Sequence, residues 1–154
     1  MRSFHGQRSL TSAIQIVPFR LRHLPRILRV EHASFGAEAW PRKYFLELYA
    51  DCRDWFIVAK VRGRIAGYAV GCAEKRNAEI ASLAVHPDYR RRGLGHAMLL
   101  DGMHRARDAG ATRMTVACLG APGHPQARGL YYKAGFRPFT LDAPLIKYAP
   151  EPEP

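Results

Sequence analysis

The sequence predicts an α/β fold in which a mixed sheet is flanked by helices. The chain has 154 residues, 47% of them hydrophobic, and this length suits one domain around one core. Strand and helix patterns follow one another in the order strand, two helices, three strands, helix, strand, helix and short strands. A run of strands followed by strand, helix and strand is typical of a mixed sheet with helices packed on it.

The first part of the chain predicts a strand and two helices. Residues 14–17 alternate well enough for a strand. Over residues 24–35 apolar side chains recur at helical spacing, and a proline there is tolerated because it falls in the first turn. A second helix is expected from about Pro41, with Phe45 on its apolar face.

The middle of the chain predicts three strands. Residues 55–61 are rich in β-branched and aromatic side chains, and the Arg62-Gly63 pair predicts a tight turn into a second strand over residues 65–72. Together they form a hairpin. Residues 79–85 predict a further strand, which the His86-Pro87 pair ends.

The last part predicts two helices and three strands. A long helix is expected from about Gly93 to Ala109, where Gly110 stops it. Residues 113–118 predict a strand and residues 125–134 a short helix, and two more short strands follow. We therefore expect a single domain over residues 14–148.

Both ends of the chain are expected to be flexible tails. Residues 1–13 are basic and rich in hydroxyl groups and lack the apolar stretch of a secretory signal, although a transit peptide is an alternative. Residues 149–154 alternate proline with other residues, and we expect a frayed tail there. No apolar run approaches the roughly 20 residues that span a bilayer, so no membrane segment is expected.

The cysteines and histidines argue against a metal site and a disulfide scaffold. Cys52, Cys72 and Cys118 are an odd number, widely spaced and without a Cys-x-x-Cys pair. This pattern fits a reducing cytoplasm. His96 and His104 are not at the spacing of a ligand pair, and we expect no metal.

The net charge of +11 favours anionic partners such as phosphorylated cofactors, nucleic acid or acidic surfaces. The charge is spread along the whole chain, however, and no stacking motif or recognition helix accompanies it. We therefore do not expect nucleic acid as the partner. Monomer and homodimer both remain open.

The most informative segment is the sequence Arg90-Arg91-Arg92-Gly93-Leu94-Gly95, which follows a buried strand and opens a helix. Unpaired backbone N–H groups at the start of a helix, close approach at glycines and forked arginine donors together predict a phosphate or pyrophosphate site. A Walker loop is excluded because no Gly-Lys-Ser/Thr follows the glycines. A dinucleotide fingerprint is excluded because Met98 occupies its third small position.

This segment matches the coenzyme A loop, Arg/Gln-x-x-Gly-x-Gly/Ala, of the GCN5-related N-acetyltransferase (GNAT) family. Residues 127–136 resemble the later family motif Ala-x-x-Leu-Tyr-x-x-x-Gly-Phe, and residues 31–48 resemble the first helices of its ribosomal-protein-alanine and peptide (RimI-like) branch. The resemblance covers about residues 14–148. It implies the GNAT fold, a mixed sheet of about six to seven strands in which a splayed parallel pair holds acetyl-CoA.

The resemblance also implies which residues contact the acetyl-CoA cosubstrate. They are the end of the strand before the loop, the loop itself, the start of the helix and one later residue: Leu83, Ala84, Val85, Arg90, Arg91, Arg92, Gly93, Leu94, Gly95, His96 and His124. His124 stands where the family commonly has an asparagine, and a surface histidine is the alternative.

Two residues are implied to act on protons. An alkyl ammonium has a pKa near 10.4, so a base must free its lone pair before attack. Glu79 has the spacing of the family's general base, and a solvated residue at the strand end is the alternative. Tyr131 occupies the position of the general acid for the departing thiolate, and a core tyrosine is the alternative. The strand over residues 113–118 lacks the glutamate that peptide acetyltransferases commonly carry there.

The expected function is therefore N-acetylation of an amine by direct attack on acetyl-CoA in a ternary complex. The Glu31 to Pro41 segment favours a protein or peptide N-terminal amine as the acceptor. A small-molecule amine is the next alternative, followed by a non-catalytic acyl-CoA-binding protein. The expected location is the cytoplasm.

Overall fold

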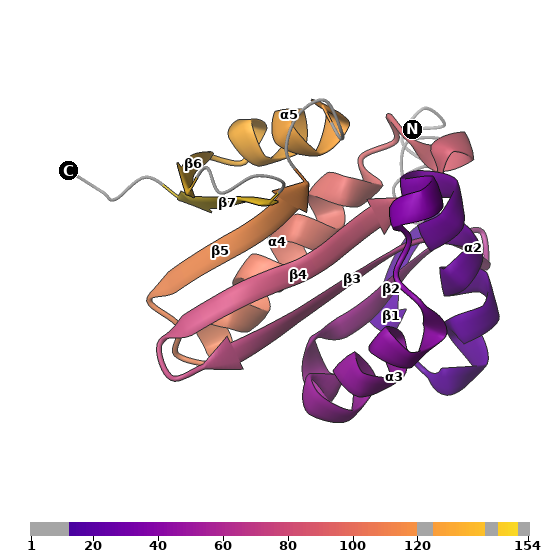
Figure 1. The fold of residues 1–154 in the computed structure, drawn as a ribbon, viewed down its shortest axis with the longest axis horizontal. Helices are drawn as coiled ribbons and strands as arrows, with labels where there is room; N and C mark the ends of the chain where they lie inside the picture. The colour runs from indigo at the N-terminus through magenta and orange to yellow at the C-terminus, as the bar shows by residue number, and fades with distance from the viewer. Residues whose placement is uncertain (1–12, 120–124, 141–144, 151–154) are drawn as a thin grey trace, which may run out of the picture.

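The computed structural model describes residues 13–119, 125–140 and 145–150. Within these ranges the strands form one seven-stranded sheet in the order β1-β2-β3-β4-β5-β7-β6 (Figure 1). The strands are β1 Ile14–Pro18, β2 Phe56–Val61, β3 Arg64–Glu74, β4 Asn77–Val85, β5 Arg113–Leu119, β6 Phe136–Thr140 and β7 Leu145–Pro150. β4 and β5 pair in parallel, and the other neighbouring strands pair antiparallel. The predicted mixed α/β fold is confirmed.

Helices cover both faces of this sheet. The α-helices are α2 Leu24–Phe35, α3 Arg42–Asp51, α4 Leu94–Asp108 and α5 Pro125–Lys133, and the short 3-10 helices are η1 Leu21–His23, η2 Gly36–Glu38, η3 Arg53–Trp55 and η4 Pro87–Tyr89. In Figure 1, α2 and α3 lie on the side of the sheet nearer the viewer, and α4 passes behind β3 and β4. The sheet therefore has an α2/α3 face and an α4 face.

The core on the α2/α3 face forms because α2 places its apolar residues on one side. Leu24, Ile27 and Val30 follow helical spacing and are buried against aromatic side chains of the sheet. Phe45 of α3 joins them, and its ring lies 5.4 Å from that of Tyr68 in β3 at an edge-to-face angle of 82°. This packing fixes α2 and α3 over β3 and β4.

The hairpin between β3 and β4 is longer than the sequence pattern predicted. Glu74 pairs with Asn77, so both strands extend into residues whose side chains are exposed on both faces. Lys75 takes the positive φ of 55° that closes the turn. The hydrophobic alternation ends before the strands do, because pairing of the backbone does not require burial of the side chains.

The C-terminal boundary of the domain differs from the predicted one. Ala149 and Pro150 belong to β7 and stand opposite Arg137 and Phe136 of β6. The expectation that residues 149–154 form a tail is therefore wrong for its first two positions. Proline is compatible with a strand at such a position because it ends the strand.

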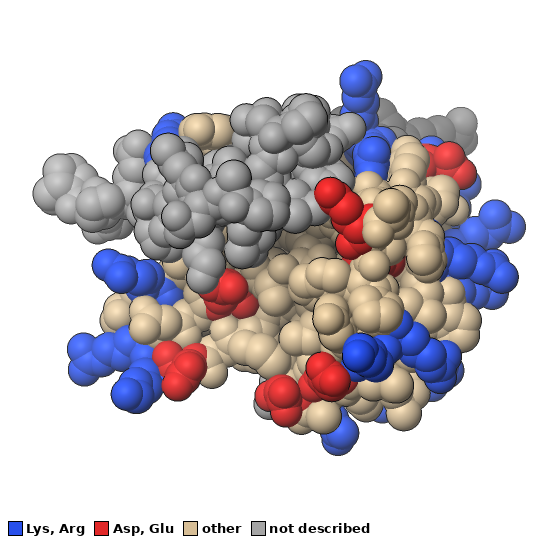
Figure 2. Space-filling model, viewed as in Figure 1, with Lys and Arg blue, Asp and Glu red and all other residues tan. Residues whose placement is uncertain are grey.

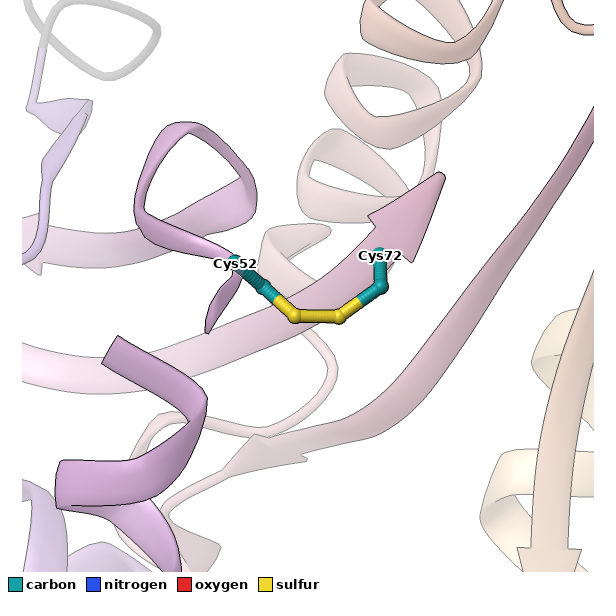
Figure 3. Close-up of a disulfide and its surroundings, with 2 residues drawn as sticks. All are labelled: Cys52 and Cys72. Atoms are coloured by element: carbon teal, nitrogen blue, oxygen red, sulfur yellow. A yellow bond between two sulfur atoms is a disulfide. The ribbon is translucent and has the colours of Figure 1, made fainter. Parts of the chain in front are cut away.

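Cys52 and Cys72 form a disulfide, which the sequence analysis disfavoured (Figure 3). Cys52 directly follows α3, Cys72 lies in β3, and their Cα atoms are 5.2 Å apart. The prediction failed because the two positions are 20 residues apart in the chain and only the packing of α3 on the sheet brings them together. The cysteine pattern therefore no longer argues for a reducing compartment.

Candidate functional site

The parallel pair β4–β5 separates halfway along β4. β4 pairs with β3 along its length, from Asn77 to Val85. Its pairing with β5 begins at Asn77 and ends where Ile80 stands opposite Val116. The C-terminal half of β4 thus has a strand on one side only, and a gap opens between it and β5.

A β-bulge at Ala81 marks the point of separation. Val70 of β3 is opposite Ser82 and Gly71 is opposite Ile80, so Ala81 has no partner on β3. The extra residue exchanges the faces to which alternate side chains point. Ile80 packs on the α4 face, where its Cδ1 lies 3.1 Å from the site of a Cβ at Gly102, whereas Ser82 contacts the core of the α2/α3 face.

Backbone groups of β4 point into the gap. The amide of His86 donates to Ala66 of β3 at 2.8 Å, which places alternate residues of β4 toward β3. Leu83 and Val85 therefore direct their N–H and C=O groups away from β3. The carbonyl of Val85 accepts from Ser34 Oγ at 3.3 Å and from Arg90 Nε at 3.2 Å. An extended chain laid in the gap could pair with this edge as a further strand would.

The gap continues into a groove of about 660 Å³ that leads to the start of α4. Most of the residues predicted to contact acetyl-CoA line it: Leu83, Ala84, Val85, Arg90, Arg91, Gly93, Leu94, Gly95 and His96. Ser34, Leu130 and Lys133 also line the groove, and the sequence analysis did not assign them to the cofactor. Lys133 follows the tyrosine pair of the later family motif, and its cationic side chain was the one available signal.

Arg92 lies apart from its two neighbours. Its guanidinium stands 5.3 Å from the centre of the Tyr89 ring, and the residue lines a second hollow together with Arg62 and Arg64. The three arginines of the loop therefore do not act as one cluster. Arg90 is held by the carbonyl of Val85, which leaves Arg91 as the loop arginine available to an anion in the groove.

The start of α4 has the geometry that the predicted anion site requires. Gly93 is the N-cap residue with a φ of 84°, and no side chain caps the helix there. A Cβ at Gly95 would lie 3.0 Å from Leu130 Cδ2, so the absence of a side chain lets α5 approach the groove. The first N–H groups of a helix have no intrahelical partner and carry partial positive charge, which suits a phosphate.

Tyr131 and Tyr132 point in different directions. Tyr131 is 2% exposed and packs among residues of β4, β5 and α4, next to the point where β4 and β5 separate. Tyr132 is 43% exposed, and Arg137 stands 5.1 Å from its ring centre. Of the two tyrosines, Tyr131 is the one buried beside the point where the strands separate.

Glu79 lies on the α2/α3 face, before the bulge at Ala81. Cys72 is its partner on β3, and directly opposed residues of an antiparallel pair share a face. The disulfide to the end of α3 identifies that face. Thr115 Oγ1 of β5 donates a hydrogen bond to Glu79 Oε2 at 3.1 Å. The half-buried carboxylate is thus oriented beside the N-terminal end of the gap.

A buried carboxylate also lies behind β4, which the sequence analysis did not assign to the site. Glu31 of α2 is 1% exposed, accepts a hydrogen bond from the Trp40 amide at 2.9 Å and accepts another from Tyr68 Oη at 2.5 Å. Tyr68 Oη lies 2.8 Å from Ser82 Oγ. Burial raises the pKa of Glu31, although its hydrogen bonds oppose the shift, and burial raises the pKa of Tyr68 well above its usual range.

His124 lies outside the described residues. Among the residues that the structure does describe, no group of three or more His, Cys, Asp or Glu side chains could hold a metal ion. No helix in the same part of the chain is long and apolar enough to cross a membrane.

Figure 2 shows the α2/α3 face of the molecule. Acidic side chains surround an uncharged central area of this face, and Lys and Arg side chains project mainly from its periphery.

Comparison with known proteins identifies the family. A profile of the acetyltransferase (GNAT) family matches residues 24–136. A Bacillus subtilis protein named "Putative ribosomal protein bS18-alanine N-acetyltransferase" is 26% identical over 119 residues, which cover 77% of this chain and 78% of that protein.

Two solved structures share the fold. The ribosomal-protein-S18-alanine N-acetyltransferase from Escherichia coli has a TM-score of 0.74 at 21% identity. The match covers 89% of this chain and 92% of the Escherichia coli chain. The PaiA N-acetyltransferase from Thermoplasma acidophilum, solved in complex with coenzyme A, has a TM-score of 0.78 at 16% identity. The match covers 90% of this chain and 98% of the Thermoplasma chain. The open edge of β4, the cradle at the start of α4 and the family match agree. The chain belongs to the acetyltransferase (GNAT) family and is an acetyl-CoA-dependent N-acetyltransferase.

Proposed function

We propose that this enzyme acetylates the N-terminal amine of a protein or peptide by direct attack of the amine on acetyl-CoA in a ternary complex. The observation that carries the proposal is the open edge of β4, because it connects the anion cradle at α4 with the α2/α3 face in one groove. The donor and the acceptor can then meet at the gap from different sides. The similarity to a Bacillus subtilis protein named for alanine acetylation supports a polypeptide acceptor.

The donor is held by groups along the groove. Backbone N–H groups at the start of α4 and the guanidinium of Arg91 bind the pyrophosphate, and Lys133 adds a third positive contact from α5. The extended arm of the donor lies along Leu83 and Val85. The N–H of Leu83 stabilises the oxyanion that forms when the thioester carbonyl is attacked, since a preorganised donor is most effective where charge develops.

Glu79 and Tyr131 complete the proposed proton transfers. Glu79 removes the proton from the incoming ammonium, because its oriented carboxylate lies on the face from which the acceptor approaches. Tyr131 protonates the departing thiolate, because its buried side chain lies where β4 and β5 diverge. Both roles follow from the positions that the family resemblance assigned.

Aromatic residues just before α3 and in its first turn wall the acceptor side in this proposal. Trp40 lies 6.3 Å from the ring centre of Tyr44 and 6.0 Å from that of Phe45. Tyr44 is 43% exposed, and an exposed aromatic side chain suits contact with a peptide. We place the reaction in the cytoplasm, where acetyl-CoA is available to a protein acetyltransferase.

An acceptor panel tests this proposal. The purified enzyme and acetyl-CoA are incubated with peptides that have a free N-terminus, the same peptides with a blocked N-terminus and an internal lysine, and free polyamines or amino acids. We expect mass spectrometry to find one added acetyl group on the free N-terminus only. Acetylation confined to free small amines would establish the alternative acceptor class, and tight coenzyme A binding without any free thiol release would indicate a non-catalytic binder.

The acid assignment has a matched pair of variants. Tyr131→Phe is expected to lower kcat by about 100-fold while coenzyme A binding is retained, because the ring remains and only the phenolic proton is lost. Tyr132→Phe is the control, since its side chain is exposed on the other side of the helix. Equal kcat values for the two variants would remove the acid role from Tyr131.

A further inference from the structure

The hydrogen bonds between Ser82, Tyr68 and Glu31 have a fixed direction. A tyrosine hydroxyl has one proton, and Tyr68 donates it to Glu31 Oε1. The contact of 2.8 Å between Ser82 Oγ and Tyr68 Oη therefore uses the proton of Ser82. Every proton in the chain points toward the carboxylate, and the lone pairs of Ser82 Oγ stand at its outer end.

The outer end of the chain reaches the place where acetyl transfer is expected. Ser82 lies between the bulge at Ala81 and Leu83, whose N–H faces the gap. Its side chain lies on the α2/α3 face, from which the acceptor approaches, and it is 8% exposed. The phenol of Tyr131 is close enough to Tyr68 to act on it electrostatically. At Tyr68 the chain therefore passes near the proposed acid, and its outer end adjoins Leu83, whose N–H faces the gap.

The inner end of the chain has the chemistry of a proton acceptor. Burial raises the pKa of Glu31. The carboxylate therefore binds a proton from the attacking nitrogen more readily than an exposed carboxylate would. The groups that face this carboxylate are the Trp40 N–H, the hydroxyl of Tyr68 and the ring of His32. Hydrogen bonds from Trp40 and Tyr68 hold both carboxylate oxygens in place, so the acceptor is preorganised.

We propose that Ser82, Tyr68 and Glu31 form a proton relay that removes an N–H proton from the attacking nitrogen as the new C–N bond forms. The N–H bond breaks and Ser82 Oγ gains that proton. Ser82 passes its own proton to Tyr68 Oη, Tyr68 passes its own to Glu31 Oε1, and the carboxylate becomes a carboxylic acid. After the amide product leaves, the proton returns along the same path to water.

This inference rests on the proposed direct attack and adds to the role of Glu79. Glu79 takes the first proton, which converts the ammonium into a nucleophile. The relay takes the second proton, which the nitrogen loses after it has bonded to the carbonyl carbon. Tyr131 supplies a third proton to the sulfur. Ser82 touches the substrate in this scheme, while Tyr68 and Glu31 act through it.

Single-turnover kinetics in mixtures of light and heavy water test the relay. For the natural protein, a plot of the transfer rate against the deuterium fraction of the solvent is expected to be curved, because several protons move together. Ser82→Ala is expected to lower the transfer rate by about 100-fold and to make this dependence linear, while coenzyme A affinity is unchanged. Ser82→Thr keeps a hydroxyl and is expected to restore the curvature.

Two further variants keep the test independent of folding. Ser34→Ala removes a hydroxyl that lines the groove and is not part of the relay, and it is expected to keep the curved dependence whatever it does to coenzyme affinity. Tyr68→Phe interrupts the relay at its middle and is expected to make the dependence linear, and circular dichroism is used to check that the variant folds. If Ser82→Ala transferred acetyl groups at the rate of the natural protein and kept the curved dependence on deuterium fraction, the relay alone would be overturned. A natural protein that transfers no acetyl group to any amine would overturn the proposed function as well.

Discussion

The two halves of β4 have the same neighbour on one side and different environments on the other. From Asn77 to Ile80 the strand is hydrogen-bonded to both β3 and β5, and the carboxylate of Glu79 is tied to Thr115 across the parallel pair. From Ser82 to Val85 it is bonded to β3 alone, and groove residues take the place of β5. One unpaired residue, Ala81, separates the two halves.

The difference shows how a structural strand becomes a binding surface. In the first half the backbone hydrogen bonds of β4 stabilise the sheet, whereas in the second half one edge is left for a substrate. The bulge also turns Ser82 onto the α2/α3 face and Leu83 onto the α4 face. A change to the backbone edge of the second half should therefore affect transfer before stability, and a change to the packing around the first half, the proposed base Glu79 apart, should do the reverse.

The largest effect is expected from Leu83→Pro. Proline removes the N–H that faces the gap but leaves the amides that face β3 in place, so it tests the open edge directly. We expect kcat to fall by about 100-fold or more, as when an oxyanion donor is removed, and acetyl transfer by the folded variant measures this.

Ile16→Pro is the control for Leu83→Pro. β1 is an edge strand that pairs with β2 alone, and Arg62 N bonds to Ala13 O, which places the Ile16 N–H on the unpaired side. The control loses a similar edge N–H far from the gap. We expect some loss of stability and a natural kcat for the folded fraction. If both variants kept a natural kcat, the open edge of β4 would have no catalytic role.

Reduction of the disulfide should act on the first half. Cys72 stands opposite Glu79, and the bond to Cys52 ties the end of α3 to that part of the sheet. With a sequence separation of 20 between the cysteines, the loop-closure argument predicts a loss of about 3 kcal/mol in the free energy of unfolding. Urea unfolding with and without a reductant measures it, while coenzyme A affinity should hardly change.

The double variant Cys52→Ser with Cys72→Ser is the control for that measurement. Its unfolding midpoint should be insensitive to reductant, because no bond joins the two positions. A reductant that lowers coenzyme A affinity in the natural protein but not its unfolding free energy would reverse the assignment of the two halves.

Arg91→Ala and Arg92→Ala sharpen the description of the second half. Arg91 lines the groove and Arg92 lines the separate hollow beside Tyr89. We expect Arg91→Ala to raise the Kd for coenzyme A by about tenfold, as for one lost charge-assisted contact, and Arg92→Ala to raise it much less. Isothermal titration at fixed salt compares the two. Equal losses would indicate that the loop binds the anion through its overall charge.

The smallest effect concerns pH and the carboxylate behind the second half. Burial raises the pKa of Glu31, so the folded state holds this proton more readily than the unfolded state. Its stabilising contribution is complete below the ordinary value of 4.5 and is lost as the pH rises through the raised value. The advantage of the natural protein over Glu31→Gln in unfolding free energy should therefore shrink with rising pH in that window. An advantage independent of pH would mean that Glu31 does not titrate there.

The site could be predicted from the sequence where local chemistry defines it. The arginines and glycines from Arg90 to Gly95 are contiguous, and the start of a helix is an anion site whatever lies around it. Tyr131 and Glu79 were assigned through the spacing of family motifs, and their roles stay predictions. Glu31, Tyr68 and Ser82 were not found together, because they lie on three elements and meet only in the packed core.

The sequence by itself determined the order of the elements and the family, and it predicted where a phosphate would bind, because these depend on motifs that each lie within about 20 residues of chain. The tertiary structure decided the bulge at Ala81, the disulfide between Cys52 and Cys72 and the divergence of Arg92 from Arg91. It also decided that a carboxylate on α2 lies behind the open strand. Each of these depends on which strand pairs with which and on which face a side chain lies, and hydrophobic patterns do not encode either at long range.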